Sequence, residues 1–315
     1  MTGRFDPGHW AVILGGSSGF GLATARVLAE RGMNLCLVHR DRRAVLASIE
    51  PEFEKLRGTG VQVRTFNSDA LSADKRAAVL DELTGVLGDE GRVRVLLHSI
   101  AFGNLKLLTP EAATTRPATG ALASKLGLDG AVVQAALDEL FGEGVDEAQA
   151  LASPPIYSDK HFLDEEDFSR TIHAMGTSLL GWVQGLFARK LFASDARIFG
   201  LTSEGNEVAW KGYAAVAAAK AALESLSRSI AVEYAPFGLR CNIVQAGITE
   251  TPALAAIPGS DQLKAQARLR NPFRRLTTPR DVANVIALLS GDDAAWINGE
   301  VIRVDGGEHI SGVTQ

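Results

Sequence analysis

The chain has 315 residues, of which 46% are hydrophobic and 22% are charged, and its formal net charge is −5. This length suffices for one large α/β domain or two small ones. The negative charge balance leaves no basic footprint for nucleic acid. The sequence shows no apolar run long enough to span a membrane and no charged-then-apolar leader. We therefore expect a cytoplasmic protein with neither nucleic-acid nor membrane partners.

Short apolar runs alternate with helix-length segments along the chain. The runs are nearly continuous in aliphatic and β-branched residues, as in strands covered on both faces. They span 10–16, 34–40, 61–69, 94–102, 196–203, 239–247 and 300–307, and helical patterns between them span 21–32, 74–88, 167–187 and 211–225. This alternation predicts a Rossmann-type, doubly wound parallel sheet in a single α/β domain covering residues 1–315. The two cysteines, Cys36 and Cys241, lie in strand runs and are expected to be buried thiols, with no metal-ligand or disulfide spacing.

One stretch, residues 104–166, interrupts the alternation and contains no strand pattern. Within it, "DGAVVQAALDELFG" at 129–142 has an apolar helical stripe, and "VDEAQALA" predicts a second short helix ended by "SPP" at 153–155. We interpret the stretch as a helical insertion after the fourth strand, at the carboxyl edge of the sheet where ligands bind. It is expected either as a lid over the substrate or as an oligomer contact.

The first strand runs directly into "GGSSGFGLATARVLAERG", in which Gly15, Gly19 and Gly21 have a G-x-x-x-G-x-G spacing. Glycines at a strand-to-helix turn permit close backbone approach, so that a pyrophosphate can lie on the helix N-terminus. Ser17, Ser18 and Phe20 belong to the same turn. A purely structural turn is the alternative, but the position after the first strand favours a dinucleotide site.

The end of the second strand is where cofactor choice is usually set. An acidic residue there binds a ribose 2′-hydroxyl, whereas this strand ends in "LVHRDRR". Arg40, with Ser17 or Ser18, can hold a 2′-phosphate by charge-assisted hydrogen bonds. The competing interpretation is that Arg40, Arg42 and Arg43 form a solvated helix start. The pattern favours NADP(H) over NAD(H).

Three further stretches give the chain its resemblance to the short-chain dehydrogenase/reductase superfamily, and within it to enoyl-acyl-carrier-protein reductases. These are "LLHSIAFG" at 96–103, "LRCNIVQAGITET" at 239–251 and "AAWINGEVIRVDGG" at 294–307. The resemblance covers nearly the whole chain apart from the insertion. It implies a cofactor site that also includes Asp69 and Ala70 near the adenine, Ser99, Ile100 and Ala101 beside the nicotinamide ribose, and Gly247, Ile248 and Thr251 around the nicotinamide.

The helix "KGYAAVAAAKAALES" at 211–225 carries the expected catalytic pair, Tyr213 and Lys220. Most members of the superfamily have the tyrosine four positions before the lysine, where this chain has Val216. The enoyl reductases have it seven positions before the lysine, as this chain does. Seven residues are nearly two helical turns, so both side chains share a face while the hydroxyl moves about 5 Å. By the resemblance, Lys220 binds the ribose hydroxyls and supports Tyr213 as the acid. A core tyrosine and a solvated lysine are the alternative.

The displaced hydroxyl has a chemical reason. An enoyl reductase delivers hydride to the β-carbon, and charge develops on the more distant thioester carbonyl oxygen, so the acid must lie further from the hydride path. Many enoyl reductases have another tyrosine where this chain has Ser203. Thr202 and Ser203 are expected either to orient the thioester carbonyl, as the serine of ketoreductases does, or to be only a strand-end hydroxyl pair. Trp210 and Phe102 are expected either to line the acyl site or to belong to the core.

These patterns lead to three hypotheses. The first is NAD(P)H-dependent reduction of the C=C bond of an acyl thioester on a carrier protein or coenzyme A, as in fatty-acid or polyketide biosynthesis. The second is a carbonyl reductase that uses Tyr213, Lys220 and Ser203. The third is a non-catalytic dinucleotide sensor, which would not need an acid aimed at the nicotinamide. The resemblance also implies a homo-oligomer, a tetramer or a dimer.

Overall fold

The computed structural model describes residues 5–111, 117–158 and 161–312, and over them the chain forms one seven-stranded sheet. The strands are β1 (His9–Leu14), β2 (Asn34–His39), β3 (Val63–Asn67), β4 (Arg92–His98), β5 (Phe192–Thr202), β6 (Arg240–Ala246) and β7 (Val301–Val304). Their order is β3-β2-β1-β4-β5-β6-β7, and every neighbouring pair is parallel. The predicted doubly wound sheet is confirmed, and each of its strands overlaps a predicted run.

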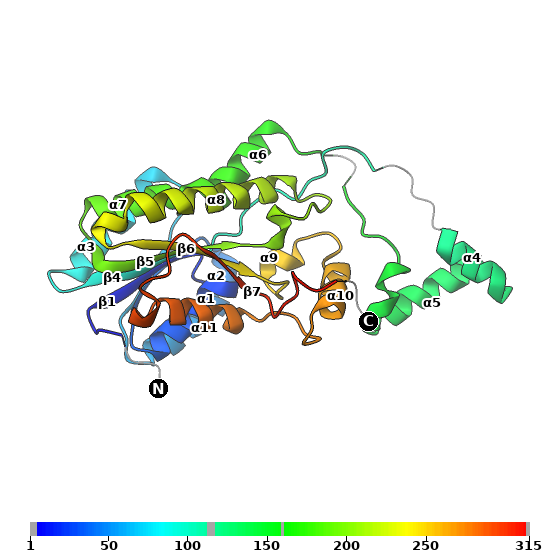
Figure 1. Cartoon of the computed structure of the whole chain (residues 1–315), viewed down its shortest axis with the longest axis horizontal. Coiled ribbons are helices and arrows are strands. Elements are labelled where there is room, and N and C mark those ends of the chain that lie inside the picture. Colours follow the sequence, from blue (N-terminus) through cyan, green and yellow to red (C-terminus); the bar gives the residue numbers. More distant parts are fainter. Residues whose placement is uncertain (1–4, 112–116, 159–160, 313–315) are drawn as a thin grey trace.

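Helices cover both faces of this sheet (Figure 1). One layer contains α1 (Gly19–Glu30), α2 (Arg43–Arg57) and α11 (Pro279–Leu289), and the other contains α3 (Ala73–Leu87), α7 (Ser178–Ala188) and α8 (Ala214–Glu233). Alternate side chains of β1 enter the two layers: Ile13 packs with the first and Val12 with the second. Because a parallel strand is buried on both sides, its sequence is apolar throughout rather than alternating.

A third group of elements gathers around the carboxyl ends of the strands. It includes α6 (Glu165–Ile172), the π-helical turn η2 (His173–Thr177), the 3₁₀ turn η3 (Glu204–Asn206), and the helices α9 (Pro252–Ala255) and α10 (Ser260–Arg270). The 3₁₀ turns η4 (Ala235–Phe237) and η5 (Asp292–Ala294) instead precede β6 and β7, at the amino ends of the strands. The helix predicted over 167–187 is therefore divided into α6, η2 and α7. None of the helices in the described part of the chain is long and apolar enough to cross a membrane.

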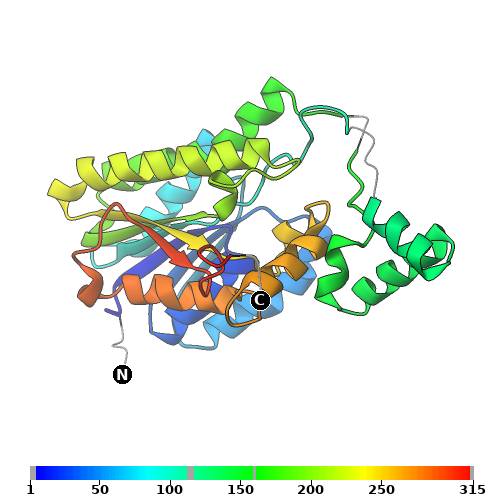
Figure 2. The same cartoon turned by 45° about the vertical axis from the view of Figure 1, so that its right-hand side comes forward.

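The insertion contains α4 (Pro117–Leu126), α5 (Gly130–Gly142) and the 3₁₀ turn η1 (Asp146–Ala150). Both predicted helices are present, and no strand occurs in its described residues. The α4–α5 pair projects away from the sheet layers, whereas η1 packs against α10 (Figures 1 and 2). On the predicted stripe only Val133 is fully buried; Val132 and Leu140 are exposed. Whether the insertion acts as a lid stays a prediction.

Candidate active site

The turn between β1 and α1 is built on close backbone approach. Gly15 has a φ of +86°, and a side-chain Cβ there would lie 2.4 Å from the carbonyl oxygen of Ser99. A Cβ on Gly21 would lie 2.0 Å from the carbonyl oxygen of Gly15. Any larger residue would therefore separate α1 from the strand ends. Ser18 precedes α1 with extended backbone, and its side chain makes no capping hydrogen bond, which leaves the helix N-terminus suited to an anion.

A groove passes over this turn and brings together most of the residues predicted for cofactor binding. Its lining includes Gly15, Ser17, Ser18, Gly19, Phe20, Arg40, Asp69, Ala70, Ser99, Ile100, Ala101 and Thr251. Gly21 does not line it; this residue is buried beneath the turn and acts by packing. The bare backbone cradle at the N-terminus of α1 fits a dinucleotide pyrophosphate. The groove therefore fits the predicted cofactor.

Arg40 lies at the end of the groove where the second strand finishes. Its Nη1 is 3.2 Å from Oδ2 of Asp69, and its guanidinium carbon lies 4.7 Å from the centre of the Phe102 ring. Phe102 therefore belongs to the nucleotide groove and does not line the catalytic pocket, so the expectation that it lines the acyl site is wrong. Stacking on an aromatic face holds a guanidinium flat and directs its donors sideways.

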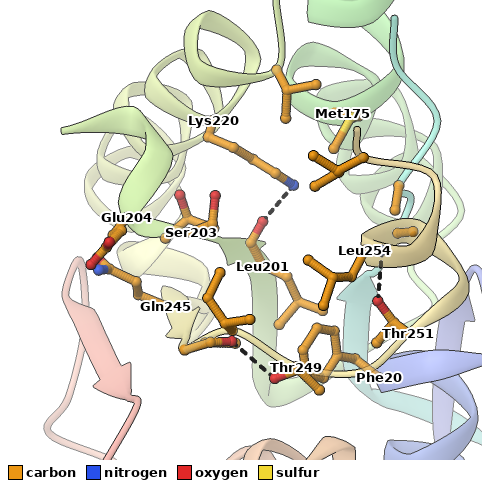
Figure 3. Close-up of a pocket in the computed structure, with 18 of the residues that line it drawn as sticks. Phe20, Met175, Leu201, Ser203, Glu204, Lys220, Gln245, Thr249, Thr251 and Leu254 are labelled. Carbon is orange, nitrogen blue, oxygen red and sulfur yellow. Dashed lines mark hydrogen bonds between the residues drawn. The ribbon is translucent and has the colours of Figure 1, made fainter. Parts of the chain in front are cut away.

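The groove opens into a second pocket that contains the predicted catalytic pair, Tyr213 and Lys220. Figure 3 shows Lys220 and Ser203 at this pocket. Tyr213 is only 9% exposed, and its hydroxyl lies 3.2 Å from Oγ of Ser203. Lys220 is 7% exposed and donates from Nζ to the carbonyl oxygen of Leu201 over 2.8 Å. The alternative of a solvated lysine is wrong, because Lys220 is buried. Tyr213 lines the same cavity and also belongs to an apolar cluster with Met175 and Val216.

Tyr213 lies just outside the observed helix, although the sequence pattern predicts a helix over 211–225. Gly212 has a φ of +73°, and α8 begins only at Ala214, so Tyr213 is the N-cap residue. Its ring packs against Trp210, which also lines the pocket. On the other side a Cβ on Gly205 would lie 2.5 Å from Cε1 of Tyr213. The ring is thus fixed by its neighbours rather than by the helix.

Burial sets the charge state of the pair. It raises the pKa of Tyr213, while the hydrogen bond from Ser203 opposes the rise. It also lowers the pKa of Lys220 to about 8, against the attraction of Glu224. Glu224 accepts hydrogen bonds from Thr202 (2.5 Å) and Asn206 (2.6 Å), which fix its carboxylate near the lysine. At neutral pH the pocket therefore holds a protonated phenol beside an ammonium group.

The pocket also contains polar residues that the sequence reasoning missed. Glu204, Gln245, Thr249, Asp305 and Glu308 line it, together with the apolar Met175, Leu254 and Ile257. Gly247 and Ile248, predicted for the cofactor, line the same pocket. Gln245 and Glu308 lie in or next to the quoted segments 239–251 and 294–307, but a single sequence does not show which polar residue at a strand end faces a cavity. No cluster of His, Cys, Asp and Glu suited to a metal ion occurs among the described residues.

Comparison with known proteins assigns the chain to a family. A family model described as enoyl-(acyl carrier protein) reductase matches residues 143–309, just over half of the chain, and a KR-domain model matches residues 10–126. The chain belongs to this first family and, with it, to the short-chain dehydrogenase/reductase superfamily. It is an oxidoreductase of that superfamily.

Relatives in the superfamily include enzymes with different named activities. The chain is 28% identical over 299 residues to cis-4-hydroxycyclohexanecarboxylate dehydrogenase of Sinomonas cyclohexanicum, covering 94% of this chain and 95% of that one. It is 28% identical over 309 residues to a probable 2,4-dienoyl-CoA reductase of Bacillus subtilis, covering 95% and 96%. The structure of FabI from Candidatus Liberibacter asiaticus matches with a TM-score of 0.73 at 19% identity over 100% of both chains. The structural likeness supports the fold.

Proposed function

We propose that the protein reduces the C=C bond of an α,β-unsaturated acyl thioester carried by coenzyme A or an acyl carrier protein. The observation that carries the proposal is the position of the acid. Tyr213 stands seven residues before Lys220, and the residue one turn before the lysine is the buried, apolar Val216, which lines the pocket. An acid displaced in this way suits protonation after hydride addition to a distant carbon. The enoyl-reductase family model and the dienoyl-CoA reductase relative support the same reaction class.

Each residue of the pair has a role that follows from its surroundings. The phenol of Tyr213 is held protonated by burial and is directed into the pocket, where it donates toward the thioester carbonyl oxygen. Lys220 can give up its hydrogen bond to the carbonyl oxygen of Leu201 and donate to the ribose hydroxyls of the cofactor instead. Its positive charge then also favours negative charge developing near Tyr213. Met175, Val216 and Leu254 give the acyl chain an apolar wall that keeps water from the reacting carbons.

The proposed cofactor is NADP(H). It would lie in the groove over the β1–α1 turn, held by backbone at Gly15 and Gly19 and by the serines of the turn. When bound, it supplies the hydride for the reduction. Arg40 would contact the 2′-phosphate, since its exposed guanidinium is already stacked on Phe102 at the groove's edge. The relation of Arg40 to Asp69 is a weak exposed ion pair that a phosphate can replace.

A second candidate is the reduction of a carbonyl, or its reverse, the oxidation of an alcohol. The 3.2 Å contact between Ser203 and Tyr213 favours it, because two hydroxyls that converge on one point can bind a single substrate oxygen. The hydroxycyclohexanecarboxylate dehydrogenase relative supports it as well. In this alternative the oxygen on the carbon that receives hydride would lie between the two hydroxyls.

One assay separates these candidates. The purified protein with NADPH is given crotonyl-CoA or acetoacetyl-CoA, and cofactor oxidation is followed at matched concentrations. We expect turnover of the enoyl substrate and its loss in Tyr213→Phe. Turnover of the keto substrate alone would overturn the proposal in favour of carbonyl reduction. Cofactor binding without turnover of either acceptor, extended to a panel of acyl chains, would favour a dinucleotide sensor.

A further inference from the structure

Gln245, at the end of β6, carries a buried amide that no part of the proposed reaction uses. It is 1% exposed and lines the catalytic pocket, yet its Oε1 has no hydrogen-bond partner among the described residues. A buried amide oxygen without a partner loses its hydration and gains nothing in exchange. Such a group calls for a ligand or a fixed water molecule.

The strand register shows that the neighbours of Gln245 do have partners. Its Cα pairs with Thr202 on β5 and with Arg303 on β7. Residues in register on adjacent parallel strands direct their side chains to the same face of the sheet. On that face Thr202 donates to Glu224, and Arg303 donates to Glu207 over 3.3 Å. Gln245 lies between these two hydrogen-bonded pairs, and it lines the cavity with its Oε1 buried and without a partner among the described residues.

Carboxylates surround this part of the pocket. Glu204 accepts two hydrogen bonds from Nη2 of Arg270, at 2.7 and 2.6 Å, and Figure 3 shows Glu204 on the same side of the pocket as Gln245. Glu308 is 2% exposed and accepts from the backbone N–H of Ile248 at 3.3 Å and from Arg270 at 3.3 Å. Two carboxyl groups therefore share one guanidinium. This environment disfavours an anionic ligand group and suits a neutral donor.

We propose that Gln245 is a specificity residue that binds a hydroxyl group on the acyl part of the substrate. The hydroxyl would donate to Oε1 of Gln245, and the apolar wall of Met175, Val216 and Leu254 would hold the carbon skeleton. This inference rests on the proposed function, since it assumes that the pocket receives an acyl thioester. Within that class it selects an oxygenated acyl group over a plain hydrocarbon chain.

The position of the subsite limits how far the hydroxyl lies from the reacting carbons. Gln245 pairs in register with Thr202, the residue immediately before Ser203, whose hydroxyl contacts Tyr213. Gln245 therefore lies beside the end of β5, close to the contact between Ser203 and Tyr213. A short chain or a ring bearing the hydroxyl fits this arrangement, whereas a long chain would direct its terminus elsewhere.

The test compares matched enoyl-CoA pairs with and without a terminal hydroxyl, namely but-2-enoyl-, pent-2-enoyl- and hex-2-enoyl-CoA and their ω-hydroxy counterparts. For one chain length we expect kcat/KM about tenfold higher for the hydroxylated member, the usual size of an effect from one buried hydrogen bond. Gln245→Met, which keeps the length of the side chain without its amide, should abolish that ratio, so that both members of a pair react with the same kcat/KM. Gln266→Met, on exposed α10 surface outside the catalytic pocket, is the matched control.

The outcomes separate the subsite from the proposed function. Three outcomes would each overturn the subsite. The first is equal rates within every pair of substrates. The second is a ratio that survives in Gln245→Met, and the third is an equal loss of rate on both members of a pair; either of these two would assign the amide to a bound water or to packing. If Gln245→Met does not fold, Gln245→Asn, which withdraws the amide from the cavity, replaces it. Turnover of no enoyl-CoA at all would overturn the proposed reduction instead. The subsite would then be decided by calorimetry on the NADP-loaded protein, with saturated ω-hydroxyacyl-CoA against acyl-CoA.

Discussion

The hydroxyl of Tyr213 lies 3.2 Å from Oγ of Ser203, and the two residues reach this contact from different elements. Ser203 follows β5, whereas Tyr213 caps α8 after the turn at Gly212. The contact therefore depends on the short segment between them, which packs its own backbone against the tyrosine ring. The position of the acid is set by this segment and by Trp210.

Gly205→Ala should misplace the acid without unfolding the protein. The new methyl group would lie 2.5 Å from Cε1 of Tyr213, so the ring must move. A displacement of about 1 Å at a catalytic group can cost about 100-fold in rate, and we expect kcat to fall by about 10- to 100-fold. Turnover and NADPH affinity should be measured together, and NADPH affinity should be unchanged. Gly120→Ala, on α4 with open space around its Cα, is the control; full activity in Gly205→Ala would show that the ring position is not critical.

The activity should fall on the alkaline side as Lys220 loses its proton. Burial lowers the pKa of this lysine to about 8, so its charge is present below that pH and lost above it. Because Glu224 raises the pKa of Lys220, Glu224→Gln should move the alkaline limb of kcat/KM to lower pH. The glutamine can still accept the bonds from Thr202 and Asn206.

The pH profile of kcat/KM should be recorded for both proteins and for Glu233→Gln, an exposed change near the end of the same helix. The control should retain the wild-type limb. A limb that stays in place in Glu224→Gln would assign it to a group other than Lys220. The raised pKa of Tyr213 keeps the phenol from contributing to this limb.

Lys220→Met should remove activity and stabilise the fold at neutral pH. The pKa of Lys220 in the folded protein is about 8 against 10.5 for an ordinary exposed lysine, a difference equivalent to about 3 kcal/mol. The unfolded chain binds the extra proton between these values, so wild-type stability rises with pH from about 8 to 10.5. After allowance for the lost bond to Leu201, we expect the variant to be about 2 kcal/mol more stable near pH 7.

Denaturant midpoints of wild type and Lys220→Met, compared near neutral pH and again above the ordinary lysine pKa, test this. The stability gap should close at the higher pH, where the wild-type lysine is neutral in both states. A variant that is less stable than wild type at both values would show that the buried ammonium is compensated in the folded protein.

The sequence was sufficient for the sheet because its strands are buried on both faces and therefore read as continuous apolar runs. The glycine turn was equally predictable from the sequence, since a side chain at Gly15 or Gly21 would collide with backbone atoms. The position of Tyr213 outside the helix could not be predicted in this way. The alanines after it are helical, but the left-handed turn at Gly212 depends on how the chain returns from β5.

The polar residues that line the catalytic pocket could not be predicted for a different reason. Gln245 lies near the end of β6, and its orientation follows from the register with Thr202 and Arg303, which are distant in sequence. Phe102 was expected either to line the acyl site or to belong to the core, but it is 47% exposed and contacts the guanidinium of Arg40. Contacts of this kind are decided by tertiary packing, which local patterns do not contain.

Arg40→Gln should weaken NADPH binding selectively. The guanidinium stacks on Phe102 at the groove's edge, and its loss removes charge-assisted hydrogen bonds that only a 2′-phosphate can use. We expect KM for NADPH to rise about tenfold or more while KM for NADH changes little. Arg43→Gln, at the exposed start of α2, should leave both values unchanged. Equal losses for the two cofactors would show that Arg40 does not select between them.

Breaking the contact that holds η1 of the insertion against α10 should change the KM for the acyl substrate but not the KM for the cofactor. Arg268 on α10 binds Asp146 on η1 through two hydrogen bonds of 2.6 and 2.5 Å. Residues just before α10, Leu254 and Ile257, line the catalytic pocket. If the insertion acts through α10, Asp146→Asn should raise KM for the enoyl-CoA by about 3- to 10-fold, with KM for NADPH unchanged.

The matched control for this anchor is Asp261→Asn, which breaks an exposed pair with Lys264 on the same helix and should leave both KM values unaltered. The mass of the assembly in solution should be measured for each variant alongside the kinetics. A change in oligomeric mass with unaltered KM for the acyl substrate would assign the insertion to a subunit contact and contradict the lid. Deletion of residues 110–155 should agree, because loss of a lid alters acyl-chain preference and turnover, and an unchanged preference would contradict the lid as well.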